Sequence, residues 1–182
     1  MHNILSTNED KNAIWQQIHL NFYTKYKYNI WHKQQKECPL CKEVPQDIYH
    51  IILECKFTKE LWKQIEPFLI KLHQINVTDE EKAFGIAQKN QTIGVLLRNW
   101  LTYSLRQKIT DAEKKAHYTK QIPNLVSFKQ NFNHHIAFLV RLKIIRYRNE
   151  NKLDLFDKLM TYSNILCIKG DNDQYSIADV FQ

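Results

Sequence analysis

Four side chains of metal-binding type lie between residues 38 and 55 of this 182-residue chain, in the pattern C-x2-C-x8-H-x4-C. Zinc prefers four thiolate or imidazole ligands in a tetrahedron, and a C-x2-C turn can bring two sulfurs around one ion. The segment is too short and too polar to bury a core, so a bound ion would supply the missing stability. The spacing therefore predicts a zinc site with the ligands Cys38, Cys41, His50 and Cys55.

Two other interpretations of the cysteine pair are weaker. A redox C-x-x-C follows a strand, whereas the polar stretch 33–37 precedes this one. An extracellular disulfide would accompany a secretion signal, and the N-terminus lacks the basic-then-apolar order of one. His50 and Cys55 are separated by about 140° on an α-helix, so we expect a turn or a frayed helix between them. The remaining cysteine, Cys167, is expected to be a buried, inert thiol.

Composition favours a mostly helical chain. Three glycines and four prolines are too few for a many-turned β-sandwich, while 43% hydrophobic and 12% aromatic residues can build a core. No apolar run approaches the ~20 residues needed to cross a bilayer, so we expect no membrane partner. The predicted fold class is mainly α, with a small CCHC zinc-binding segment, a helical, basic C-terminal segment and a short terminal β-hairpin.

Hydrophobic spacing predicts helices in the first half of the chain. A short amphipathic helix is expected around residues 14–22, and an apolar stripe over residues 61–72 predicts another. Pro67 lies inside that stripe, so this helix is either kinked or divided in two. Residues 76–81 begin with cap-type side chains and predict a loop that opens into a short helix.

The second half shows longer periodic runs. An apolar face over residues 92–109 predicts a helix. Residues 121–124 predict a break, because Pro123 ends the element that precedes it. Ser127 is expected to cap a helix that continues to residue 149, although residues 140–144 also alternate as a strand would.

The end of the chain is expected to hold a short helix over residues 153–162 and a hairpin around Gly170. These elements suggest three parts: a lead-in of residues 1–36, the zinc segment with its following helix over residues 37–75, and the basic helical segment of residues 76–182.

Positive charge is concentrated in one segment. The chain carries a net charge of +7, yet residues 82–149 hold thirteen lysines and arginines against two acids. Such asymmetry is expected for a polyanion partner, because phosphate contacts release counterions. Arg141 and Arg148 are seven residues apart and share a helical face, whereas Arg146 has an ion pair as its alternative role. The candidate phosphate contacts are Arg141, Lys143, Arg146 and Arg148, followed by Lys114, Lys115 and Lys120.

The residues around the ligands follow a recognisable order. Pro39 lies inside the C-x2-C pair, Tyr49 precedes His50 beyond an acidic loop, and Trp62 follows Cys55 by seven positions. This order resembles the zinc-binding domain that follows the polymerase in LINE-type non-LTR retrotransposons. The likeness is sharp over about residues 36–70 and looser beyond. It implies a C-terminal segment that engages template or target during reverse transcription, with the rest of a retrotransposon protein as a partner.

We expect no enzyme activity from this chain. A polymerase holds Mg²⁺ with paired aspartates, and the sequence has no Asp-Asp pair. The Pro-Asp pattern of a retrotransposon endonuclease does not follow Cys55. The adjacent His134 and His135 point apart on a helix and have no acid nearby in sequence, so we interpret them as surface or core residues. A zinc ion with four protein ligands also has no position for a reactive water.

The functional hypothesis is an intracellular, nuclear or cytoplasmic, zinc-stabilised module that binds nucleic acid. RNA is favoured over DNA because tyrosine and tryptophan side chains near the zinc segment can stack unpaired bases. The alternative is a zinc-stabilised protein-interaction scaffold whose basic segment meets an acidic protein. Asp47 or Glu54 is either an acceptor for the second ring proton of His50 or simply an exposed acid.

Overall fold

A computed structural model describes residues 37–43, 47–86, 92–171 and 174–181. The predicted helix around residues 14–22 lies outside these ranges. Within them the chain is mainly α-helical, as predicted, and no helix is long and apolar enough to cross a membrane. The elements are a π-helical turn (His50–Glu54), α3 (Lys56–His73), α4 (Asp79–Phe84), α5 (Ile93–Thr119), α6 (Leu125–Asn149), α7 (Leu153–Met160), a 3-10 turn (Tyr162–Asn164), β1 (Cys167–Lys169) and β2 (Tyr175–Ile177).

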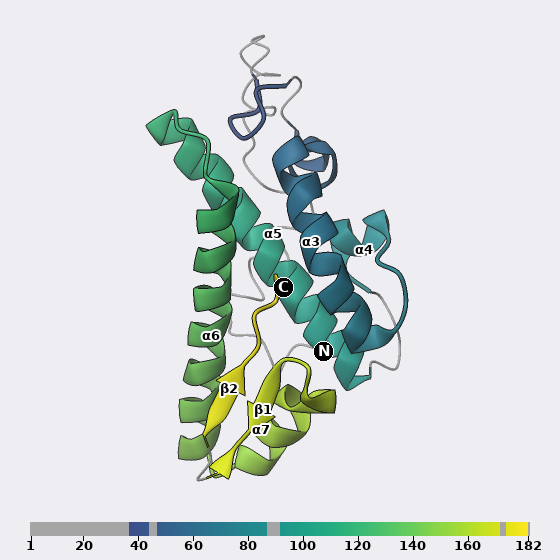
Figure 1. Cartoon of the computed structure of the whole chain (residues 1–182), viewed down its shortest axis with the longest axis vertical. Coiled ribbons are helices and arrows are strands. Elements are labelled where there is room, and N and C mark those ends of the chain that lie inside the picture. The colour runs from purple at the N-terminus through teal and green to yellow at the C-terminus, as the bar shows by residue number, and fades with distance from the viewer. Residues whose placement is uncertain (1–36, 44–46, 87–91, 172–173, 182) are drawn as a thin grey trace.

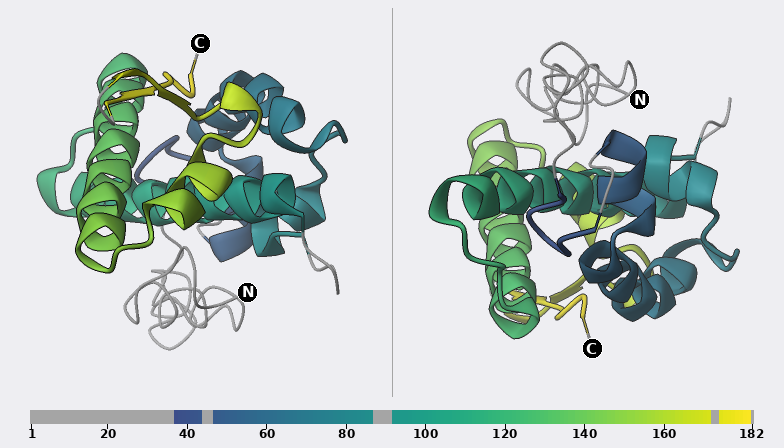
Figure 2. Two further views of the ribbon diagram at one scale, coloured as in Figure 1. Left: turned by 90° about the horizontal axis from the view of Figure 1, so that it is seen from below. Right: turned by 90° about the horizontal axis from the view of Figure 1, so that it is seen from above.

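The longest helices, α5 and α6, form a V joined at one end of the molecule (Figure 1). Helix α3 packs along α5, and α7 with the β-hairpin covers the far end of α6. The segment of residues 37–43 lies at the end where α5 and α6 are joined, and Figure 2 shows it between that turn and the start of α3. The ligand-bearing segment is therefore supported by the helical body rather than separate from it.

Helix α3 continues through Pro67 as one helix, which excludes the second of the two predicted alternatives, a division into two helices. Proline removes one helical hydrogen bond and crowds the preceding turn. Here Pro67 lies on the exposed face of the helix, while the buried stripe continues on both sides of it. Packing of that stripe against α5 outweighs the local cost. The buried residues are Leu61, Trp62, Ile65, Phe68, Leu69 and Leu72.

The ends of α5 and α6 follow local capping chemistry. The Thr92 hydroxyl accepts a hydrogen bond from a backbone N–H of the first turn of α5, which begins as predicted and extends beyond residue 109 to Thr119. Helix α6 is capped by Asn124 and not by Ser127, because the Asn124 side chain accepts from the Ser127 backbone N–H at 3.1 Å. Residues 140–144 are helical, which rules out the strand interpretation.

A buried ion pair joins α4 to α5. Arg98 is fully buried and pairs with both carboxylate oxygens of Glu81, with Nη2 2.6 Å from Oε2. It also donates to the carbonyl oxygens of Ile75 at 2.6 Å and Asn76 at 3.1 Å. Arg98 belongs to the basic excess of residues 82–149, but it is paired inside the protein and does not contribute its charge to the surface. It holds the loop after α3 and the short helix α4, which is where residues 76–81 were predicted to open into a helix.

The C-terminal elements confirm the predicted helix and hairpin. Strands β1 and β2 are antiparallel, with Cys167 opposite Ile177 and Lys169 opposite Tyr175. Cys167 is completely buried, and burial raises the pKa of its thiol to about 12, as expected for an inert thiol. Core residues from the zinc segment to the C-terminal tail form one cluster in the described part of the chain. The three-part division of the chain stays a prediction.

Candidate metal centre

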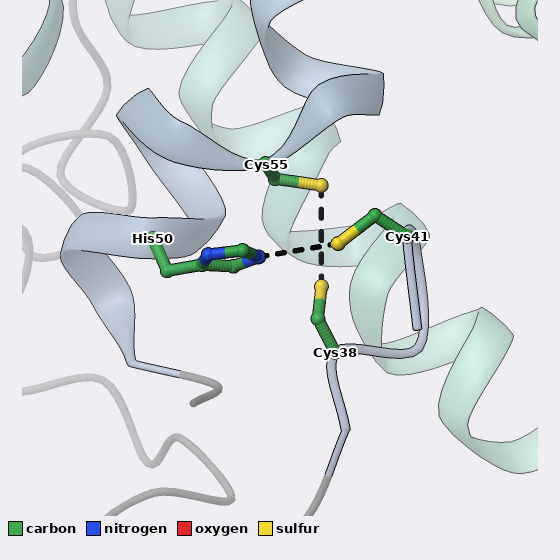
Figure 3. A group of neighbouring side chains, drawn as sticks. All are labelled: Cys38, Cys41, His50 and Cys55. Atoms are coloured by element: carbon green, nitrogen blue, oxygen red, sulfur yellow. Dashed lines mark hydrogen bonds between the residues drawn. The ribbon is translucent and has the colours of Figure 1, made fainter. Parts of the chain in front are cut away.

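The structure brings all four predicted ligands together (Figure 3). The Sγ atoms of Cys38 and Cys55 are 4.0 Å apart, and Cys41 Sγ lies 3.2 Å from His50 Nε2. All four ligand atoms lie within 4.8 Å of one another. With zinc–sulfur bonds of about 2.3 Å, two thiolates in a tetrahedron are separated by about 3.8 Å. A sulfur–sulfur distance of 4.0 Å is also far beyond the ~2.05 Å of a disulfide bond. The site therefore fits a tetrahedral ion.

The first ligand pair is held by a tight turn. Lys42 follows Cys41 in the left-handed region at φ 66°, and its N–H donates to the Cys38 carbonyl at 2.7 Å. The Cys38 N–H donates in return to the Glu43 carbonyl at 2.8 Å. Leu40, at the tip of the turn, is 2% exposed and anchors it in the hydrophobic core. The turn thus presents both sulfurs on the same side.

A π-helical turn positions the second pair. The Cys55 N–H donates to the His50 carbonyl at 2.7 Å, a bond between residues five apart. A π-helix has more residues per turn than an α-helix, so side chains five residues apart point toward nearly the same side. A π-helical turn therefore lies where a turn or a frayed helix was predicted between the two ligands. Asp47 fixes the start of the turn, since its carboxylate accepts from the His50 backbone N–H at 2.7 Å.

Helix α3 closes the π turn with two side chains. The Thr58 hydroxyl donates to the Ile51 carbonyl, and the Trp62 indole N–H donates to the Ile52 carbonyl, each at 2.7 Å. Both donors are buried and lie four residues apart on one face of the helix. In the sequence Trp62 stands out by its place seven positions after Cys55, but these two hydrogen bonds were not predicted. The i, i+4 spacing of a hydroxyl and an indole after the last ligand was the available signal.

The cluster is built to hold negative charge. Cys55 is the N-terminal cap residue of α3. A hydrogen bond from the Cys38 thiol, together with backbone N–H groups of Thr58 and Phe57, lowers the pKa of Cys55 to about 5. The same interaction with Cys55, together with burial, raises the pKa of Cys38. Burial raises the pKa of Cys41. Because thiolates are the form that binds zinc, a bound cation would replace the shared proton.

The two acids considered as partners of the His50 ring lie differently. Asp47 binds the backbone of His50 rather than its ring. A carboxylate oxygen of Glu54 lies 3.9 Å from His50 Nδ1, beyond hydrogen-bond distance but within the range of an ion pair, and Glu54 is 54% exposed.

The candidate phosphate contacts fall into two groups. Lys114, Lys115 and Lys120 are exposed at the end of α5, close to the start of α6. The others lie on the second half of α6, roughly 30 Å away along a helix that rises about 1.5 Å per residue. There Arg141 and Arg148 are exposed.

Lys143 and Arg146 each have a partner within the protein. Lys143 is half-buried, with its Nζ 5.8 Å from the centre of the Trp100 ring. Arg146 pairs with Glu150 at 2.9 Å, which is the alternative role considered for it. Arg106, another cation of the basic segment, is buried, and burial lowers its pKa to about 10. The basic segment therefore exposes fewer cations than its sequence suggests.

Comparison with known proteins agrees with the geometry of the cluster. The model of a family described as zinc-binding in reverse transcriptase matches residues 7–62, a stretch that contains all four ligands but covers less than half of the chain. No curated protein and no solved structure matches the chain. The zinc cofactor predicted from the spacing is confirmed by the family match and the four-residue cluster together. Over residues 7–62 the chain is similar to a zinc-binding segment associated with reverse transcriptases.

Proposed function

We propose that this chain is a zinc-stabilised module that binds single-stranded nucleic acid, RNA in preference to DNA, within or beside a reverse transcriptase of the LINE type. The observation that carries the proposal is the convergence of Cys38, Cys41, His50 and Cys55 in a segment similar to the zinc-binding part of reverse transcriptases. In this proposal these four residues are the ligands of one zinc ion. The ion is structural, because four protein ligands leave no open position for substrate or water.

Charge and exposed aromatic rings support the nucleic-acid part of the proposal. Tyr118 is 82% exposed on the last turns of α5, next to Lys114, Lys115 and Lys120. Tyr49 is 57% exposed beside the ligand His50. Exposed rings next to lysines suit a flexible strand, whose bases stack on the rings while its phosphates meet the cations. We expect this end of the molecule to contribute more than Lys143 or Arg146, which already have partners.

A second candidate function, a protein-interaction scaffold, is favoured by one observation. The outer face of α6 exposes Phe138, Leu142 and Ile145 at helical spacing, each 46–56% exposed, beside Arg141 and Arg148. Apolar side chains on a helix surface contribute little to phosphate binding, whereas an amphipathic acidic helix would cover both the apolar ridge and the arginines beside it. In this alternative the arginines of α6 meet carboxylates instead of phosphates.

The proposal is tested by titrating the purified chain with single-stranded RNA, and with DNA of the same sequence, at low and moderate salt. We expect binding that weakens by roughly tenfold or more between about 50 and about 200 mM salt, because each phosphate contact releases counterions. Replacing Lys114, Lys115 and Lys120 together by alanine should reduce both the affinity and the slope. Gln130→Ala, an exposed neutral change on α6, is the control. Absence of binding at low salt, or binding that does not respond to salt, would reject the nucleic-acid function.

A further inference from the structure

A hollow of about 480 Å³ lies between the last turns of α5 and the first turns of α6. Its lining comes from both helices and from the loop that joins them. Ala112 and Ala116 line it from α5, Phe128 and Phe132 from α6, and Ile122 from the loop. Phe128 is 8% exposed, Phe132 only 1% and Ile122 51%, so Phe128 and Ile122 offer more apolar surface to the hollow than Phe132. The volume is within the range of small-ligand pockets.

Polar groups surround this apolar part. Lys108 and Lys115 line the hollow from α5, together with the carboxylate of Asp111, so the lining carries a net charge of one positive unit. Gln121 and Asn131 also line it, and the carboxamide of each offers both donors and an acceptor. A nucleotide has the matching parts: a flat apolar base with polar edges, and a phosphate. Apolar walls, carboxamides and lysines are the groups that proteins use for these parts.

The hollow is linked to the metal centre by an aromatic contact. Phe128 packs edge-on against Phe57, with ring centres 5.5 Å apart and planes at 88°. Phe57 is the second residue after the ligand Cys55, at the start of α3. The N-terminal turn of α3 therefore supports both the zinc ligands and the lining of the hollow. A strand bound at this end of the molecule passes close to its opening, where Lys114 and Lys120 are exposed.

We propose that the hollow between α5 and α6 receives one nucleotide of the bound strand, with the base against Phe128 and Ile122 and the phosphate at Lys108 and Lys115. This inference rests on the proposed function, since it assigns a specific site to a strand that the basic surface attracts. Asp111 faces the same space and disfavours a second phosphate there, so the site takes a single nucleotide rather than a compact run of them.

Adjacent lysines provide a matched test. Lys115 lines the hollow and Lys114 does not, although both are exposed on the same helix with the same charge. The full chain, loaded with zinc, is titrated with uridine and adenosine monophosphates and with a single-stranded oligouridylate. We expect Lys115→Ala to weaken mononucleotide binding by about tenfold and Lys114→Ala to leave it unchanged. Both variants should show the same reduced salt slope for the oligonucleotide, because each removes one surface charge.

A second variant blocks the hollow without changing charge. Ala112→Phe places a ring in the space, and zinc content with far-ultraviolet circular dichroism reports whether the variant is folded. Loss of mononucleotide binding in a folded Ala112→Phe chain supports the site. Equal mononucleotide binding by Lys114→Ala, Lys115→Ala and Ala112→Phe would overturn it, even if the oligonucleotide still binds and the proposed function stands. Mononucleotide binding without oligonucleotide binding would support the hollow as a site for a free nucleotide and reject the proposed function.

Discussion

Two clusters of buried polar groups in this protein each require a cation, and they obtain it from different sources. The metal centre gathers three thiols and an imidazole, and the junction of α4 with α5 gathers a carboxylate and three backbone carbonyls. Oxygen and sulfur groups of this kind repel one another when buried unless a cation lies among them. At the junction the cation is the guanidinium of Arg98, which is part of the chain. At the metal centre the chain supplies only ligands.

Only one of the two clusters depends on solution conditions. A covalently attached cation is present whenever the chain is folded, so the junction is insensitive to metal concentration. The zinc end exchanges its cation with solution, and its folding is coupled to that exchange. Substitutions in the two clusters should therefore have distinguishable effects on zinc content and on stability.

The largest effect is expected for Cys55→Ser. The serine hydroxyl is a poor zinc ligand, and the π turn that Cys55 ends would lose the ion that joins it to the C-x2-C turn. We expect zinc content to fall from about one ion per chain to near zero. Residues 37–57 should become accessible to proteases while most of α5 and α6 stays protected. Elemental analysis and limited proteolysis measure the two outcomes.

Cys167→Ala is the matched control for that experiment, because Cys167 is a buried cysteine outside the cluster. This variant should keep its zinc, although it loses some stability through a small cavity. Equal zinc content in Cys55→Ser and Cys167→Ala would show that the four residues do not hold the ion.

Arg98→Met is expected to give the next largest effect, a loss of stability without a loss of zinc. It leaves Glu81 buried with a charge and no cation, which costs about 3–5 kcal/mol when one partner of a buried pair is removed. Urea unfolding should report this loss, while the zinc content of the folded protein stays unchanged. The double variant Arg98→Met with Glu81→Leu should recover part of the stability, because no unpaired charge is left. A loss of zinc in Arg98→Met would mean that the two clusters are not independent.

Trp62→Phe should have a moderate effect confined to the zinc end. The change keeps an aromatic ring but removes the N–H that satisfies the Ile52 carbonyl. A buried acceptor left without its donor costs about 1–3 kcal/mol, so zinc affinity measured by competition with a chelator should fall by roughly tenfold. Trp100→Phe, a buried tryptophan of α5 that contacts Lys143, is the control and should leave zinc affinity unchanged. Equal zinc affinities in the two variants would show that the indole hydrogen bond of Trp62 does not stabilise the metal centre.

Local chemistry made much of this fold predictable. Ligand spacing, the apolar stripes of α3 and α5, the break at Pro123 and the C-terminal hairpin all depend on residues close together in sequence, and each was found in the structure. The cap of α6 was missed by three residues. Asn124 and Ser127 are both good cap residues; Asn124 has the extended backbone of a cap and its side chain accepts from the Ser127 N–H, so Ser127 already lies inside the helix.

Features that require distant segments to meet were not predictable in this way. A count of charges cannot show that Arg98 is buried, because its partners are Glu81 and the loop that ends α3. The π turn between His50 and Cys55 is stabilised by side chains of α3, so its type follows from tertiary packing. The hollow is lined by residues of α5, of α6 and of the loop that joins them, so it forms only when α6 packs back on α5.

The smallest effect is expected for Glu43→Gln, which removes an exposed ion pair at the zinc end. Glu43 lies 2.6 Å from Lys56, and this hydrogen-bonded contact lowers the pKa of the Glu43 carboxyl. A carboxyl whose pKa is lower in the folded state stabilises that state at neutral pH, and the contribution is lost as the pH falls through the folded-state value. Both side chains are well exposed, so water and salt screen the pair.

We therefore expect Glu43→Gln to change thermal stability only slightly at neutral pH and low salt, and not at all in high salt. Zinc content should equal that of the unmodified chain, because Glu43 is not among the four ligands. The comparison is made by thermal unfolding of the zinc-loaded protein at two salt concentrations and at two pH values on either side of the carboxyl titration. A large loss of stability that persists in high salt would show that the C-x2-C turn depends on this ion pair as well as on the metal.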